Sequence, residues 1–137
     1  MTPIKLASVV QENKQQAFLN CPVTYVMEKI GGYWKPIILF SLLTGPKRYS
    51  EIRKAIPGLT EKVLIQQLKQ LETAGLVIRR SKAVVPPHVT YELSASGKAL
   101  RPVLYAMAEW AVSTGGEESP AFAKRMSDFP AEPPIDE

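Results

Sequence analysis

The chain has 137 residues, a formal net charge of +4 and a hydrophobic content of 45%, enough for one domain with a real core. No apolar run approaches the roughly 18 to 20 residues that cross a bilayer, which excludes a membrane-spanning helix. The single cysteine, Cys21, excludes an internal disulfide, and residues 1–14 lack the apolar core of a secretory signal. We therefore expect a cytoplasmic protein.

The positive charge is distributed unevenly. Residues 1–114 carry fifteen basic and seven acidic side chains, whereas residues 115–137 carry two and six. The end of the chain is also rich in proline, so residues 114–137 are predicted to form a disordered acidic tail. The basic body favours a polyanionic partner, although a solvated basic face explains the charge equally well.

Three helices are predicted before residue 45. The first covers about residues 7–19, and the second begins at Pro22, which suits the first helical position, and covers residues 22–30. The third covers residues 34–43 and is apolar almost all round, so we expect it at the centre of the fold. Pro36 is tolerated because it falls in the first turn of that helix.

The segment 45–93 has the outline of a winged helix-turn-helix. Ser50 is expected to open a short helix, residues 57–59 (Pro-Gly-Leu) form a turn, and Thr60 caps a longer helix that ends near Ala74. In such a motif the second helix enters the major groove of DNA.

The longer motif helix has two faces. At 100° per residue, Leu64, Leu68 and Leu71 share one face and are expected to be buried. The candidate DNA-contacting residues of the helix are Thr60, Glu61, Lys62, Ile65, Gln66, Gln67, Lys69 and Gln70. Glutamine can pair bidentately with adenine, an aliphatic side chain can touch the thymine methyl group, and lysine suits phosphate. For the helix alone, a polar surface with one harmless exposed isoleucine explains the pattern equally well.

Two further groups of basic residues flank this helix. Candidate contacts to the DNA backbone are Lys47, Arg48, Ser50 and Arg53, where the helix beginning near Ser50 offers free N–H groups to a phosphate. Strands are predicted at residues 76–80 and 89–93, joined by a connection that contains Pro86-Pro87. The candidate wing contacts are Arg79, Arg80, Lys82 and His88. The first three cluster at one end of this hairpin, and His88 lies across the connection from them. Such a basic loop can enter the adjacent minor groove or clamp phosphates.

After the hairpin, Ser94 is predicted to cap a long helix that covers residues 95–112. Its apolar positions are Leu100, Val103, Leu104, Met107, Ala108, Trp110 and Ala111. This stripe exceeds what a small domain needs, so we expect a dimer interface built from this helix and the first one. The first helix offers Val9, Val10, Ala17 and Phe18 for burial. In the alternative interpretation both helices pack on the core of their own chain.

The sequence resembles the HxlR family of bacterial transcription regulators, which is related to the MarR group. The matching segments are residues 21–23 (CPV), 30–35 (IGGYWK), 45–53 (GPKRYSEIR), 64–72 (LIQQLKQLE), 75–77 (GLV), 85–91 (VPPHVTY) and 93–100 (LSASGKAL). Pro36 departs from the family pattern, which has an aliphatic residue there, and the tail lies outside the resemblance. The resemblance implies a winged helix-turn-helix core at residues 21–94 between dimerisation helices at 1–20 and 95–113. It also implies a homodimer on a roughly palindromic double-stranded operator, with recognition helices about 34–36 Å apart.

The resemblance also implies that some family members respond to oxidants, quinones or aldehydes through the cysteine that matches Cys21. Cys21 is expected just ahead of a helix, where the helix dipole favours the thiolate. Oxidation could join it to its counterpart in a second subunit and change the spacing of the two recognition helices. An inert cysteine kept for packing is the alternative. A small-molecule effector could bind near Trp34, Tyr105 or Trp110, although these aromatic residues are equally suited to the core.

The sequence offers no pattern for catalysis, a cofactor or a metal. The single histidine, His88, is predicted on the hairpin, far from Cys21, and one cysteine with one histidine makes no tetrahedral metal site. Gly31-Gly32 lies between helices and makes no phosphate loop after a strand. The mainly helical winged helix-turn-helix with one small hairpin is therefore expected to bind DNA. The remaining alternative is a winged-helix protein-interaction module without sequence-specific DNA binding.

Overall fold

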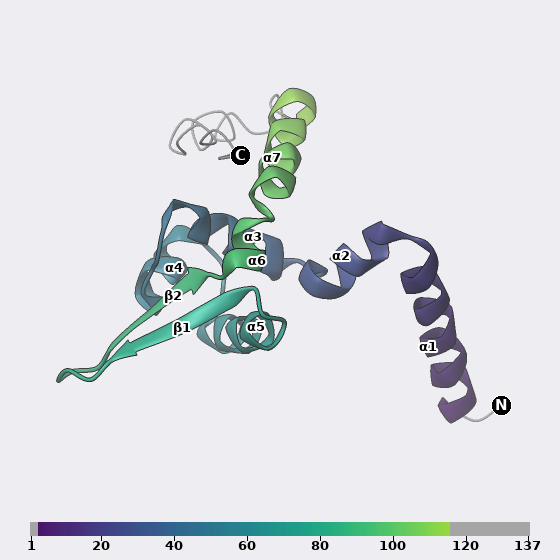
Figure 1. Cartoon of the computed structure of the whole chain (residues 1–137), viewed down its shortest axis with the longest axis horizontal. Coiled ribbons are helices and arrows are strands. Elements are labelled where there is room, and N and C mark those ends of the chain that lie inside the picture. The colour runs from purple at the N-terminus through teal and green to yellow at the C-terminus, as the bar shows by residue number, and fades with distance from the viewer. Residues whose placement is uncertain (1–2, 116–137) are drawn as a thin grey trace. The chain divides into compact units, whose positions relative to one another are not determined.

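A computed structural model describes residues 3–115, apart from the side chains of residues 3–8 and 17–19. Along the chain the elements are α1 (Pro3–Asn20), α2 (Pro22–Ile30), α3 (Trp34–Ser41), the 3-10 helix η1 (Leu42–Thr44), α4 (Tyr49–Ala55), α5 (Glu61–Thr73), β1 (Val77–Lys82), β2 (His88–Leu93), α6 (Ala95–Lys98) and α7 (Arg101–Gly115) (Figure 1). The predicted class, mainly helical with one small β-hairpin, is confirmed. The chain divides into two compact units between Tyr33 and Trp34, which are described separately.

The first unit holds α1 and α2, which pack against each other. The first helix is longer than predicted, because it already begins at Pro3, a residue that suits a first helical position. Val9 and Val10 were expected to be buried, but they are 48% and 50% exposed. The helix α2 begins at Pro22 and ends at Ile30 as predicted.

The second unit is built around α3, as its apolar sequence predicted. Ile38 and Leu39 are fully buried, and α3 packs against α4, α5 and α7. The helix ends two residues earlier than expected, because the chain tightens into η1 after Ser41. The hydroxyl group of this buried serine donates a hydrogen bond to the carbonyl of Ile38 at 2.7 Å.

The hairpin is antiparallel, with Val77 opposite Leu93 at its base and Lys82 opposite His88 at its outer end. The strand β2 begins at His88, one residue earlier than predicted, and the histidine lies across the connection from Lys82 as expected. Lys47 forms an isolated bridge with Tyr91, through two backbone hydrogen bonds of 2.9 and 2.8 Å. The hairpin extends away from the helices of this unit, and β1 packs against α5 (Figure 1).

Two predicted helix boundaries are wrong. The short motif helix begins at Tyr49, because Arg48 is its N-cap and donates its backbone N–H to the Glu51 carboxylate at 3.0 Å. The predicted helix 95–112 is two helices, α6 and α7, although Ser94 caps the first one as expected through a 3.1 Å bond from the Gly97 N–H. A continuous helix would place Pro102 in its interior, where it lacks the N–H and its ring clashes with the preceding turn. In the observed arrangement Pro102 falls in the first turn of α7.

The far end of the chain differs slightly from the predicted tail at residues 114–137. Thr114 and Gly115 belong to α7, which ends at Gly115. Residues 116–137 lie outside the described residues.

Candidate nucleic-acid interface

The helix α5 is fixed in place from one side. Thr60 is its N-cap and accepts a hydrogen bond from the Val63 N–H at 3.3 Å, as predicted. Gly58, with a positive φ of 86°, makes the turn before it, a conformation that glycine adopts without strain. The three leucines at positions 64, 68 and 71 are 0–1% exposed. Burial of three large side chains holds the helix axis against the core, so that the opposite face is presented rigidly.

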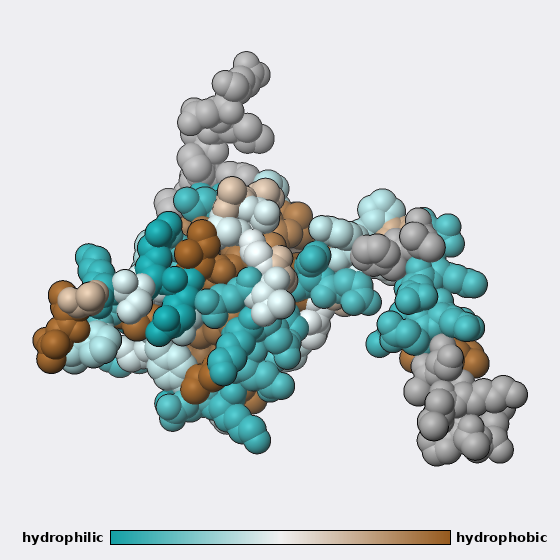
Figure 2. All heavy atoms as spheres, turned by 60° about the horizontal axis from the view of Figure 1, so that its bottom comes forward, coloured by the Kyte–Doolittle hydropathy of each residue, from teal (hydrophilic) through white to brown (hydrophobic). Residues whose placement is uncertain are grey.

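That opposite face is open and mostly polar. The exposed members of the predicted set are Thr60, Glu61, Lys62, Ile65, Gln66, Lys69 and Gln70, while Gln67 is half-buried. Ile65 is 42% exposed beside the exposed amide of Gln66. Hydrophilic side chains predominate over the part of this unit that carries α5, with isolated apolar groups among them (Figure 2). The structure thus places the predicted groups, apart from Gln67, on an exposed surface of α5.

Tyr49 connects α4 to the start of α5, and the sequence analysis missed it. Its phenolic O–H donates a hydrogen bond to the backbone carbonyl of Glu61 at 3.2 Å. Burial raises the pKa of the Tyr49 phenol, and the nearby Glu61 carboxylate raises it further, whereas Arg53 lowers it. Tyr49 therefore remains a protonated donor at neutral pH and fixes the first turn of α5. A tyrosine directly before the predicted helix start was the available signal.

The basic residues near α4 are arranged differently from expectation. Arg48, Ser50 and Arg53 are exposed, but the Lys47 ammonium group donates a hydrogen bond to Thr44 Oγ1 at 2.6 Å. At the start of this helix, one backbone donor already has a partner within the chain. Ser50 lies inside the first turn, and the Arg48 N–H is already occupied by the Glu51 carboxylate. The exposed side chains of Arg48, Ser50 and Arg53 remain candidate phosphate contacts.

In the hairpin, Arg79, Arg80 and Lys82 are exposed and His88 is half-buried. Arg80 forms an ion pair with Glu92 on the neighbouring strand, a partner that the sequence analysis did not consider. Opposite charges on adjacent strands were the signal for this pair. Because Glu92 offsets the Arg80 charge, Arg79 and Lys82 are better placed to attract phosphate.

Cys21 occupies the N-cap position of α2, as expected, and is exposed. Its backbone carbonyl accepts a hydrogen bond from the Thr24 N–H at 3.1 Å, and its side chain makes no capping bond. On the same helix, the Lys29 ammonium group lies 5.6 Å from the centroid of the Tyr25 ring. The thiol is therefore accessible to reagents in the chain as described.

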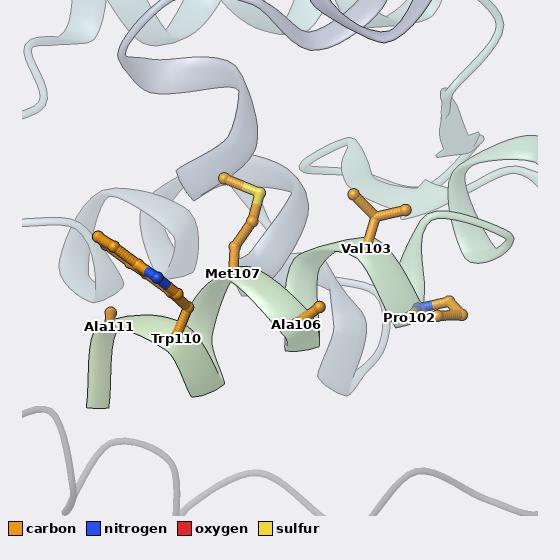
Figure 3. A pocket seen from close by; sticks show the side chains of 6 residues that line it. All are labelled: Pro102, Val103, Ala106, Met107, Trp110 and Ala111. Carbon is orange, nitrogen blue, oxygen red and sulfur yellow. The ribbon is translucent and has the colours of Figure 1, made fainter. Parts of the chain in front are cut away.

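The outer face of α7 is apolar. Its lining residues, which border a shallow depression, are Pro102, Val103, Ala106, Met107, Trp110 and Ala111. Figure 3 shows Val103, Met107 and Trp110 projecting from the same side of the helix, and they are 39%, 51% and 70% exposed. In contrast, Leu104 and Tyr105 are buried, and the Tyr105 ring meets Phe40 edge-on at a centroid distance of 6.2 Å. Tyr105 is thus a core residue, whereas Trp110 is a surface residue.

Within residues 3–115, no cluster of three or more histidine, cysteine or acidic side chains is arranged to hold a metal ion. No helix in this range is long and apolar enough to span a membrane.

Comparison with known proteins agrees with this geometry. The profile described as HxlR-like helix-turn-helix matches residues 29–119. The uncharacterized HTH-type transcriptional regulator YkvN of Bacillus subtilis is 43% identical over 91 residues, which cover 66% of this chain and 77% of YkvN. YtfH of Escherichia coli, described in the same words, is 34% identical over 110 residues, which cover 80% of this chain and 86% of YtfH.

Two solved structures are similar as well. The redox regulator HypR in its oxidized form has a TM-score of 0.66 and 39% identity, with coverage of 69% of this chain and 97% of HypR. The reduced form of the transcriptional regulator YodB from B. subtilis has a TM-score of 0.60 and 35% identity, covering 69% of this chain and 93% of YodB. With the winged helix-turn-helix geometry, these matches show that the chain belongs to the HxlR-like helix-turn-helix family of transcriptional regulators.

Proposed function

We propose that this regulator binds a roughly palindromic DNA operator as a homodimer, with α5 in the major groove and the hairpin at the adjacent minor groove. The observation that carries the proposal is the face of α5 opposite its buried leucines, which offers amide, ammonium and aliphatic groups to a groove. Gln66 would pair with adenine and Ile65 would touch a thymine methyl group, because these groups match the edges of A·T pairs. The remaining α5 contacts would come from Thr60, Glu61, Lys62, Gln67, Lys69 and Gln70.

Phosphate contacts would surround this base-reading region. Lys62 and Lys69 lie on the same exposed face of α5 and would bind the phosphates that border the groove. The flanking contacts would come from Lys47, Arg48, Ser50 and Arg53 before and in α4, and from Arg79, Arg80, Lys82 and His88 in the hairpin. Of these, Arg80 and Lys47 would contribute less, because each already has a partner within the chain.

The proposed dimer interface consists of the outer face of α7 together with α1. Val103, Met107 and Trp110 leave an apolar surface on α7, and α1 exposes Val9 and Val10. Exposed apolar patches of this kind mark interaction sites in soluble proteins. In this organisation residues 1–20 and 95–113 join the two subunits and residues 21–94 carry the DNA-binding core. The function and the single cysteine both fit a cytoplasmic location.

Binding to DNA is tested with the full-length protein and a pool of random-sequence duplexes. We expect enrichment of a sequence with two related half-sites, and an affinity that falls steeply as salt rises. A protein that neutralises 6–10 phosphates loses about 10³–10⁵ in affinity between 50 and 200 mM salt. Enrichment of no sequence, or a flat salt response, would instead favour a winged-helix protein-interaction module.

Cys21 is the candidate for a redox response of this regulator. It is exposed at the start of α2, and two structurally similar proteins are described as the redox regulator HypR in its oxidized form and as diamide-treated YodB. Diamide would oxidise two thiols to a disulfide between subunits and take up the two electrons and two protons. We expect the Cys21→Ser variant, which has no thiol to oxidise, to keep its DNA affinity in diamide, whereas the native protein changes both its covalent state and its affinity. If diamide changes neither in the native protein, Cys21 is not a sensor.

A further inference from the structure

The connection between β1 and β2 ends in an apolar tip. Residues 83–87 have the sequence Ala-Val-Val-Pro-Pro, and all five are exposed. Val84 is 51% exposed, and Val85 is fully exposed. Figure 2 shows this end of the hairpin as an apolar projection at the left of the molecule. Apolar side chains at the most exposed point of a basic hairpin require a reason other than stability of the fold.

This tip is poorly suited to phosphate. Pro86 and Pro87 have no backbone N–H, and the Val84 N–H already donates to the Lys82 carbonyl at 2.9 Å. Residues 83–87 also contain no charged or hydroxyl side chain. The cationic groups Arg79 and Lys82 lie on the strand behind the tip. The hairpin thus has a cationic stem and an uncharged, apolar end.

The minor groove of DNA has the matching distribution of chemistry. Its rims carry phosphates, whereas its walls and floor are deoxyribose and base edges, which apolar side chains, proline among them, contact in minor-groove-binding proteins. Since β1 packs against α5, a hairpin that follows α5 onto DNA reaches the groove next to the one that α5 occupies. We propose that Val84, Val85 and Pro86 form an apolar probe that enters this minor groove and contacts deoxyribose and base edges, while Lys82 binds the phosphates at its rim.

The inference rests on the proposed function and adds a preference for particular base pairs in the minor groove. Guanine places an N2 amino group on the floor of the minor groove, and A·T pairs leave that floor unobstructed. A probe without hydrogen-bonding groups gains nothing from the amino group and is obstructed by it. The hairpin therefore adds a preference for flanks without this amino group, which α5 does not read.

The test uses the duplex that the full-length protein enriches from the random pool. Hydroxyl-radical footprinting locates the minor-groove positions that the hairpin protects, and these are made G·C or inosine·C. Inosine removes only the N2 amino group and leaves the major-groove edge unchanged. We expect the native protein to bind the inosine·C duplex roughly three- to tenfold more tightly. The Val84→Ser/Val85→Ser double variant should lose this preference and keep the salt dependence of the native protein.

Two control variants separate the tip from its surroundings. Lys82→Ala should keep the preference for inosine. It should reduce the slope of log affinity against log salt concentration (the salt slope) by about one. Val23→Ser, which changes a valine of 65% exposure on α2, should behave as the native protein does. Equal binding of the two duplexes by the native protein, or a preference that survives in the double variant, would overturn the proposal that the hairpin tip enters the minor groove. Failure of the native protein to enrich any duplex would instead overturn the proposed function, so the two failures are distinguishable.

Discussion

The helices α5 and α7 are both half-buried, but their exposed faces have opposite chemistry. In α5, Leu68 and its neighbouring leucines are buried, and Gln66 and Lys69 are exposed. In α7, Leu104 and Tyr105 are buried, but Met107 and Trp110 remain exposed as well. The leucines of α5 are therefore all packed in the core, whereas α7 packs only one side of its apolar surface there.

This difference separates two kinds of partner. A helix that buries its apolar face and exposes a polar, cationic face is stable in water, and its exposed face is available to a polyanion. An apolar face that remains exposed is costly in water and is expected to pack against protein. The comparison supports the proposed roles, with DNA on α5 and a second copy of the chain on α7, and a charge placed on each face should distinguish them.

The largest effect is expected from Met107→Glu. In the proposed dimer this change buries an unpaired carboxylate, at a cost of about 3–5 kcal/mol, so the dimer dissociation constant should rise by a factor of 100 or more. Sedimentation equilibrium measures that constant. Affinity for the two-half-site operator should fall with it, because only one recognition helix then remains per bound particle.

Ile65→Glu is the matched control on the other helix. It introduces the same carboxylate on the exposed face of α5, where it should repel DNA and leave the dimer intact. If Met107→Glu remains fully dimeric, or if Ile65→Glu dissociates the dimer, the assignment of the two faces is wrong.

Leu68→Ala tests the buried side of α5. Leu68 is 1% exposed, and truncation of a buried leucine lowers the free energy of unfolding by about 2–5 kcal/mol. Urea unfolding measures the loss. Gln70→Ala changes an exposed side chain of the same helix and should stay within about 0.5 kcal/mol of the native protein. Equal losses in the two variants would show that α5 is not held by its leucines.

Gln66→Ala is expected to cost about 1–3 kcal/mol of binding free energy on the enriched operator and to relax discrimination at one base pair. The measurement compares the affinity for the operator with the affinity for duplexes altered at each position. A uniform loss on specific and non-specific DNA would contradict the base-reading role of this glutamine.

Lys69→Ala should weaken every duplex alike and reduce the salt slope by about one, since a phosphate contact carries no sequence information. Lys98→Ala removes an exposed lysine of α6, outside the proposed surface, and serves as the control. A change in sequence preference with Lys69→Ala, or an equal change in slope with Lys98→Ala, would contradict this role.

The sequence predicted α5 well because its signals are local. The cap at Thr60, the turn at Gly58 and the leucine spacing lie within a few residues of each other, and all three agree. The boundaries of α4 were harder, because Arg48 caps it through its backbone and the Glu51 side chain. The break before α7 was missed because apolar periodicity continues through Pro102.

The features that depend on distant segments were not predictable from local patterns. The bridge between Lys47 and Tyr91 and the ion pair between Arg80 and Glu92 require the register of the hairpin, which the sequence alone left open. The ion pair gives Arg80, a candidate phosphate ligand, a partner within the chain, and the bridge fixes the backbone of Lys47 against β2. The side of α7 that remains exposed likewise depends on how α3 packs against it.

Tyr49→Phe is expected to have the smallest effect, on stability and not on dimerisation. The loss of the hydrogen bond to the Glu61 carbonyl should lower the free energy of unfolding by about 0.5–1.5 kcal/mol at neutral pH. Because burial raises the pKa of Tyr49 in the folded chain, folding favours the protonated phenol. The contribution is therefore fully present below the unfolded pKa of about 10 and is lost as pH rises through the higher folded value. Urea unfolding from pH 7 to pH 11 should show the native protein and the variant converging at the alkaline end. A gap that stays constant or widens would mean that the phenol does not hold the first turn of α5 as a donor.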